Sequence, residues 1–337
     1  MSASRNSTEP RASASGPERG GALLMVLWLS AALGAIALSV SITVRTEMEH
    51  TSAVTDGLRA HYLATGSLDR AIQWILWGAS ARNPDGTARF WDRTKPRMFM
   101  SYPSGEAVVE MISESSKLNV RQATEAELLK VVTALTGDPA RANGVVAGIV
   151  AWRSGQLNSS PGSTFQAPPA SLQEIEELLF VPGVTPELFY GNYVEDGQGR
   201  LYARGGLRDC LSVWGTRGNV DANGAVPAVL EAVGMNPSDA AQLVRARAAK
   251  PFENISDVQK LGIPITRLQV NGGTMWTIRA TARLRRPGGP LTETVRSAAV
   301  VVKYWDDPRQ HPSPVQVLRY YGDAWSEFGP ASVGVTQ

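Results

Sequence analysis

The stretch from Gly21 to Val44 constrains this chain most, because it contains no charged residue. At about 1.5 Å per residue, a helix over this range is roughly 35 Å long, enough to cross a bilayer core with some tilt. A polar leader that ends Pro17-Glu18-Arg19-Gly20 precedes it. The sequence therefore predicts a membrane-spanning helix close to the N-terminus.

The apolar pattern continues beyond this stretch in steps of three and four residues, as on one face of an amphipathic helix. We predict one rod from about Gly21 to Trp77, which lies in lipid at its start and packs on a soluble body at its end. The predicted packing stripe consists of Met48, Val54, Leu58, Tyr62, Leu68, Ile72 and Ile75.

Length and composition set further bounds. A chain of 337 residues allows two or three domains, and a hydrophobic content of 43% supports a core beyond the membrane segment. The formal charge of +2 gives no bias toward nucleic acid or acidic lipid. Because Cys210 is the one cysteine, no intrachain disulfide forms, and we read it as a small apolar residue.

The start of the chain does not read as an ordinary secretory signal. The apolar run is too long, and the candidate small residues, Gly20 and Gly21, come before it rather than after it. Three arginines precede the run and two follow closely, which favours a cytoplasmic N-terminus. These arginines are Arg5, Arg11, Arg19, Arg45 and Arg59.

The string from Arg19 to Trp28, RGGALLMVLW, resembles the processing site of type IV pilin-like proteins. In detail it is similar to the K-type minor pseudopilins of bacterial type II secretion, the general secretion pathway protein K family. The resemblance implies that a prepilin peptidase cuts after Gly20 and that the new N-terminus, Gly21, is N-methylated.

Most pilins carry Glu at the fifth mature position, where this chain has Met25, and the lack of that Glu is also the K-type pattern. A carboxylate inside the bilayer is costly and needs a partner. In the family it is thought to neutralise the N-terminal amine of a neighbouring subunit. A subunit with Met25 is therefore expected to start a filament rather than extend one. Read locally, Met25 is equally an apolar anchor residue facing lipid.

Strand patterns flank a long helical region. A hairpin is expected from Met98–Tyr102 and Ala107–Ile112, and alternating strands from Met275–Leu284 and Thr292–Trp305, with a short strand at Val315–Tyr320. The predicted fold class is α+β, a pilin-like long N-terminal helix packed on an antiparallel sheet with a large inserted all-α domain. The predicted segments are the leader 1–20, the membrane half of the helix 21–44, the first part of the pilin-like domain 45–117, the insert 118–270, the last strands 271–320 and the tail 321–337.

The insert repeats itself. Two units, about 118–190 and 218–270, share the order of an Asn-containing string, a helix ending in Arg, a Phe, a capped acidic helix and a glycine turn. The matched landmarks are Asn119 and Asn219, Arg153 and Arg247, Phe165 and Phe252, and the turns Val181-Pro182-Gly183-Val184 and Leu261-Gly262-Ile263-Pro264.

Such units resemble helix-hairpin-helix or SAM-like modules, which in nucleic-acid-binding versions present backbone N–H groups to a phosphate. Here residues 118–270 hold thirteen Lys and Arg and fifteen Asp and Glu, a net charge of about −2. We therefore interpret the glycines as turns between short helices, and no nucleic acid is expected to bind. A membrane-anchored DNA-binding or uptake receptor stays open as the alternative.

The K-type resemblance extends into this insert. Ser116-Lys117-Leu118-Asn119-Val120 fits the family's GKLNLN-like string. The string from Gly218 to Asn223 departs from VNVNTAP where Thr-Ala-Pro would follow, and Ser113-Glu114 stands where the family often has Asp-Glu. The resemblance runs from Arg19 to about Tyr304.

No catalytic constellation is visible. None of the histidines, His50, His61 and His311, lies in a metal-binding string, and no nucleophile elbow or P-loop occurs. The acidic strings Glu195-Asp196-Gly197 and Asp306-Asp307 carry oxygen ligands of the kind Ca²⁺ prefers, and some K-type pseudopilins bind calcium. No full ligand loop is readable, so we assign no cofactor and no metal residue. A membrane-tethered enzyme with an unrecognised site is the third hypothesis.

The resemblance implies a minor pseudopilin at the tip of the type II secretion pseudopilus, without enzymatic activity, which helps to initiate assembly and export across the outer membrane. It implies a single-pass protein of the bacterial inner membrane with a cytoplasmic N-terminus and a periplasmic body. The implied partners are the I- and J-type minor pseudopilins, the major pseudopilin, the prepilin peptidase and the inner-membrane secretion platform.

Overall fold

The computed structural model describes residues 19–78, 81–91, 95–154, 172–195, 199, 201–270, 272–285, 288–305 and 314–324. The chain divides into two compact units, residues 1–56 and residues 57–337, and each is described by itself. Most of the predicted leader, the predicted tail beyond residue 324 and the landmark Phe165 lie outside the described residues.

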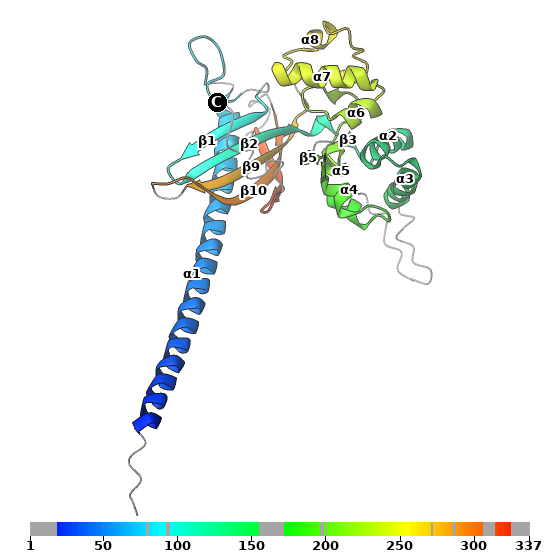
Figure 1. Cartoon of the computed structure of the whole chain (residues 1–337). Coiled ribbons are helices and arrows are strands. Elements are labelled where there is room, and N and C mark those ends of the chain that lie inside the picture. The colour runs from blue at the N-terminus through cyan, green and yellow to red at the C-terminus, as the bar shows by residue number, and fades with distance from the viewer. Residues whose placement is uncertain are drawn as a thin grey trace, which may run out of the picture. The chain divides into compact units, whose positions relative to one another are not determined.

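Helix α1 runs from Arg19 to Gly78 without interruption. Its sequence contains no proline, which would break the hydrogen-bonding ladder. Within the second unit, residues 57–78 of α1 lie against one face of a sheet (Figure 1). The buried positions recur in steps of three and four, as one helix face requires. They are Ala60, Ala64, Leu68, Ala71 and Ile75.

This buried face corrects the predicted packing stripe. Leu68 and Ile75 are buried and Ile72 is partly buried against the sheet core, as predicted. The other four positions are 54–68% exposed: Met48, Val54, Leu58 and Tyr62. Leu58 and Tyr62 were assigned to the wrong face, because the sheet is approached by alanines in this part of α1, whereas Met48 and Val54 belong to the first unit and stay predictions. Tyr62 lies two positions before Ala64, and at about 100° per residue the two side chains point in nearly opposite directions.

The sheet has five strands in the order β1-β2-β9-β10-β11, and every neighbouring pair is antiparallel. The predicted strands are therefore confirmed, with small shifts at their ends. The strands are β1 (Arg97–Tyr102), β2 (Gly105–Ser113), β9 (Met275–Arg285), β10 (Leu291–Tyr304) and β11 (Val315–Tyr321).

The two faces of the sheet differ in chemistry. Apolar side chains such as Met98, Val109 and Ile278 face α1 and form a shared core. The opposite face carries polar residues, among them Glu110 and Arg279, which form a 2.7 Å ion pair between β2 and β9. Alternation predicted a half-exposed strand, yet Arg279 is 0% exposed. The polar face is buried because its charges are paired rather than hydrated.

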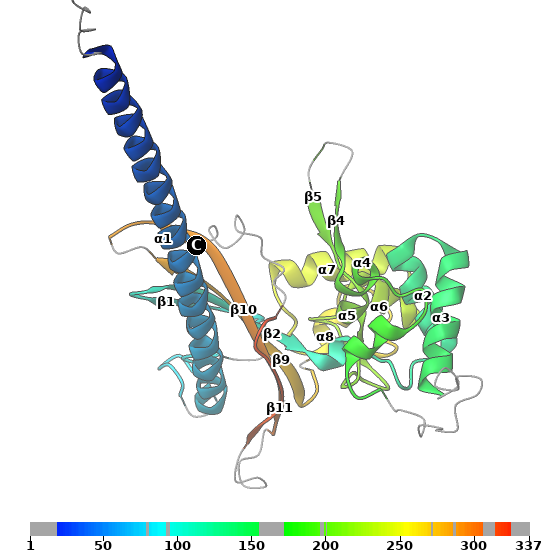
Figure 2. The same ribbon diagram turned by 90° about the horizontal axis from the view of Figure 1, so that it is seen from below.

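The remaining elements follow β2 and precede β9, and they have a core of their own (Figure 2). They are mostly short helices, as predicted, with three small ladders added: β3 with β6, β7 with β8, and the hairpin β4–β5. In chain order they are η1 (Glu114–Ser116), β3 (Leu118–Asn119), α2 (Glu125–Thr136), α3 (Pro139–Arg153), η3 (Ile175–Phe180), α4 (Pro186–Tyr190), β4 (Asn192–Glu195), β5 (Leu201–Arg204), α5 (Leu207–Cys210), β6 (Leu211–Ser212), β7 (Val220–Asp221), α6 (Pro227–Ala232), α7 (Pro237–Ala249), α8 (Ile255–Gln259) and β8 (Leu268–Gln269).

The two units of the insert repeat the same backbone arrangement. Arg153 Nη1 donates hydrogen bonds to the carbonyls of Val120 and Ala123, at 3.4 and 2.7 Å. Arg247 Nη1 donates to the carbonyls of Ala222 and Ala225, both at 2.7 Å.

The strand that opens each unit also matches. Strand β3 pairs in parallel with β6, and β7 pairs in parallel with β8. Asn119 and Asp221 hold equivalent positions, since each accepts a 3.0 Å hydrogen bond from the backbone N–H two residues on. The shared arginine and strand geometry supports a duplicated module, with Asn119 equivalent to Asp221 rather than to Asn219.

Candidate functional site

The first part of α1 is the candidate membrane anchor. By length and composition, α1 is the one helix in the described chain that could cross a membrane. Its large apolar side chains between Leu23 and Val44 are more than half exposed. An isolated helix with this surface is stable when lipid covers it.

The residues predicted for processing lie at the start of this helix. Gly20 and Gly21 belong to its first turn. Met25 follows one turn later, with 76% of its surface exposed, so the fifth position after the predicted cut presents a thioether and no charge. Cleavage after Gly20 and methylation of Gly21 stay predictions.

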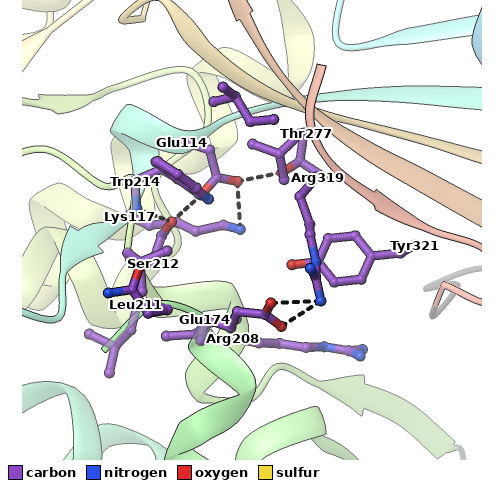
Figure 3. A pocket seen from close by; sticks show the side chains of 15 residues that line it. Glu114, Lys117, Glu174, Arg208, Leu211, Ser212, Trp214, Thr277, Arg319 and Tyr321 are labelled. Atoms are coloured by element: carbon purple, nitrogen blue, oxygen red, sulfur yellow. Dashed lines mark hydrogen bonds and ion pairs between the residues drawn. The ribbon is translucent and has the colours of Figure 1, made fainter. Parts of the chain in front are cut away.

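A buried polar cluster joins the insert to the sheet (Figure 3). At its centre Glu114, in the 3-10 helix that follows β2, is 2% exposed. Its carboxylate accepts hydrogen bonds from Lys117 Nζ at 3.0 Å and from Thr277 Oγ1 of β9 at 2.7 Å. Ser212 of β6 donates a third hydrogen bond to it. One carboxylate thus connects both strands of the sheet junction to the insert.

A second contact lies nearby. Arg319 of β11 places Nη2 at 2.6 and 2.8 Å from the two carboxylate oxygens of Glu174, in the insert. A cavity of about 190 Å³ separates this pair from Glu114, and Arg208 and Tyr321 also line it. The pair Glu174–Arg319 is partly exposed, so it contributes little stability, whereas the side chains of Glu114 and Lys117 are buried.

The charge states of this cluster follow from its surroundings. Burial disfavours the carboxylate of Glu114, but Lys117 and the bonds from Ser212 and Thr277 outweigh it, so its pKa lies below the usual value. Burial raises the pKa of Glu176, with a smaller contribution from the neighbouring Glu174. Glu114 and Lys117 thus hold their charges as a fixed buried pair, an arrangement suited to positioning the insert.

The acidic and histidine candidates that the structure describes are not brought together. No group of three or more His, Cys, Asp or Glu side chains in the described residues is placed to hold a metal ion. Glu195 is exposed on β4, His50 is exposed and His61 is half-buried. Asp196, Asp306, Asp307 and His311 lie outside the described residues. The buried Cys210 has a raised pKa because of desolvation, consistent with a small core residue.

Sequence reasoning missed Glu114 as the centre of the junction. A signal was present: Ser113-Glu114-Ser115-Ser116-Lys117 is a polar run between an apolar strand and an apolar string. Such a run also fits an exposed turn. Its burial depends on Ser212 and Thr277, which lie far along the chain.

Comparison with solved structures finds chains of similar fold. No family model and no curated protein sequence matches the chain. Among solved structures, it is similar to a chain in the crystal structure of the GspK-GspI-GspJ complex from the type 2 secretion system of enterotoxigenic Escherichia coli. The TM-score is 0.45 and the sequence identity 17%, over 84% of this chain and 99% of the other.

Proposed function

We propose that this chain is a K-type minor pseudopilin of a type II secretion system. The start of α1 anchors it in the inner membrane, and the sheet and insert lie in the periplasm. The charge-free stretch Gly21–Val44 directly behind Arg19-Gly20 supports this, as does the packing of residues 57–78 on an antiparallel sheet. The protein acts as a structural subunit and has no enzymatic activity.

The strongest support for the proposal is that the insert interrupts the chain between two paired strands. Strands β2 and β9 are neighbours in the sheet, yet residues 114–274 lie between them in sequence. A body of this bulk is hard to accommodate within a packed filament shaft and fits at the end of one. Met25 agrees, because a subunit without a carboxylate there lacks the pairing that would insert it beneath another. We therefore place the chain at the pseudopilus tip, where it initiates assembly.

The same proposal assigns partner subunits to the exposed apolar face of α1. Met48, Val54, Leu58 and Tyr62 leave an apolar face of α1 uncovered in the chain by itself. In the pseudopilus this face packs on the helices of the I- and J-type minor pseudopilins. The major pseudopilin, the prepilin peptidase and the inner-membrane platform are the other partners of this role.

Intact-mass measurement on protein purified from the native membrane tests the proposal. We expect loss of residues 1–20 and gain of one methyl group at Gly21. The Gly20→Ala variant should keep its full mass, because the peptidase no longer recognises the site, while Gly34→Ala, further along the same helix, should be processed normally.

An unprocessed wild-type chain would contradict the pseudopilin role and leave an ordinary signal anchor. In that case the receptor hypothesis is tested next, by titrating duplex DNA at low salt. Gly183 and Gly262 both have positive φ angles, as in the glycine turns of nucleic-acid-binding helix-hairpin-helix modules. The near-neutral insert predicts no binding.

A further inference from the structure

The first repeat of the insert contains an open groove that its role in the junction does not use. The groove has a volume of about 410 Å³ and lies between the end of α2, the start of α3, α4 and the hairpin β4–β5. Two arginines point cationic groups toward it, and hydroxyl and amide groups share the lining. The polar lining residues are Thr136, Arg141, Thr185, Glu187, Asn192 and Arg204.

Both guanidinium groups are held in place. Arg204 Nη2 donates a 2.9 Å hydrogen bond to the carbonyl of Ala134, near the end of α2. Arg141 Nη2 donates a 3.3 Å hydrogen bond to Thr185 Oγ1, which also caps α4. Each of these two hydrogen bonds uses one nitrogen of a guanidinium group, which carries five N–H donors in all. Two oriented cations beside one groove form a receptor for an oxyanion, and little side-chain entropy is lost when it binds.

The second repeat acts as an internal comparison. Helices α3 and α7 begin alike, with Asp138-Pro139 and Asn236-Pro237 as cap and first residue. The third helical residue is Arg141 in the first repeat and Asp239 in the second. The second repeat also passes from Gly262 to β8 without a hairpin like β4–β5, the element that supplies Arg204. Both arginines of the groove are therefore specific to the first repeat, and the fold that the two repeats share does not require them.

We propose that this groove binds a carboxylate of an extended acidic peptide from a partner protein. Strand β4 pairs only with β5 among the described residues, and the hairpin projects from the insert (Figure 2), so its outer edge can receive an extended chain.

The charge pattern favours a peptide over nucleic acid. Glu187 stands at the groove, and its pKa is lowered by a backbone hydrogen bond, Thr185 and Arg141, so it is ionised at neutral pH. A phosphate backbone needs a run of cations, whereas this insert is nearly neutral. A single carboxylate needs only Arg141 and Arg204, and it competes there with Glu187.

Fluorescence anisotropy with the full-length chain in detergent tests the proposal. The probe is a labelled hexaglutamate peptide with blocked ends, and the matched probe is hexaglutamine. We expect Arg141→Gln and Arg204→Gln each to weaken hexaglutamate binding about tenfold or more, since one charge-assisted hydrogen-bonding group is lost. Arg245→Gln, on the exposed surface of α7, should leave it unchanged. Glu187→Gln should strengthen binding several-fold, an effect that a damaged fold cannot imitate.

Several outcomes would overturn the proposal. One is equal binding of hexaglutamine, another is no binding of hexaglutamate by the wild type, and a third is indifference to Arg141→Gln. Inorganic phosphate is added as a competitor, and a single-stranded DNA 20-mer is titrated in parallel. DNA binding that is tighter than peptide binding and depends on Arg141 would assign the groove to nucleic acid instead. None of these readouts depends on membrane processing, so the result is separate from that of the pseudopilin proposal.

Discussion

At the scale of single residues, Glu114 is a side chain whose loss the fold should tolerate poorly. Replacing it by Gln removes the charge that pairs with Lys117 at 3.0 Å, and Lys117 is itself only 8% exposed. Breaking a buried ion pair from one side costs about 3 kcal/mol or more. We expect Glu114→Gln to lower the free energy of unfolding by this amount, measured by urea denaturation in detergent at pH 7.

The same variant has a pH signature. The pKa of Glu114 is depressed in the folded state, so its stabilising effect is complete above the unfolded value of about 4.5 and is lost as pH falls through the folded value. The stability difference between wild type and Glu114→Gln should therefore shrink below about pH 4. Glu106→Gln, on the preceding strand β2, is the control, because the Glu106–Arg285 pair is about one-third exposed and its loss should cost less than about 1 kcal/mol. Equal losses for the two variants would refute the special position of Glu114.

At the scale of elements, β2 depends on a glycine where three segments meet. A Cβ on Gly105 would overlap the carbonyl oxygen of Arg283 on β9 and lie 2.9 Å from Leu63 Cδ2 of α1. Gly105→Ala must displace backbone, so we expect a loss of at least about 2 kcal/mol in thermal unfolding. Gly144→Ala, in α3 with no neighbour within 4 Å, should instead be stabilising by up to about 1 kcal/mol. A neutral Gly105→Ala would show that β9 does not approach β2 this closely.

The elements also show what a sequence can and cannot specify. Period-two patterns located the hairpin β1–β2 and strand β9, because each strand alternates against one apolar core. The face of α1 that meets the sheet was not predictable, since Ala60, Ala64 and Ala71 carry a weaker hydrophobic signal than Leu58 and Tyr62 on another face. Small side chains are needed where α1 lies close to the sheet. How close the two lie depends on the surface of the sheet, which the helix sequence alone does not reveal.

At the scale of the whole molecule, the sequence predicted an insert with a duplicated helical module but not how it is attached. The glycine turns and the arginine that ends each long helix are local signals, and the structure places them equivalently. The junction depends on contacts between residues far apart in sequence, such as Ser212 and Arg319 with Glu114 and Glu174. The groove arginines, Arg141 and Arg204, were missed for the same reason.

The arrangement of two separate cores predicts that the insert can be removed. Ser113 and Trp276 face each other in the register of β2 and β9, so a two-residue Asn-Gly loop can replace residues 114–275 as a hairpin turn. Among the described residues, the apolar core between α1 and the sheet involves none from the insert. We expect this deletion variant to unfold cooperatively at a lower temperature than the wild type, because removing the insert exposes Thr277 and Val301.

Intact mass should still show the cut after Gly20, and hexaglutamate binding should be absent. Under the proposed function the variant is processed but does not support secretion, whereas Gly20→Ala in the same background fails at both steps. An aggregated variant without a cooperative transition would show instead that the sheet needs the insert to fold.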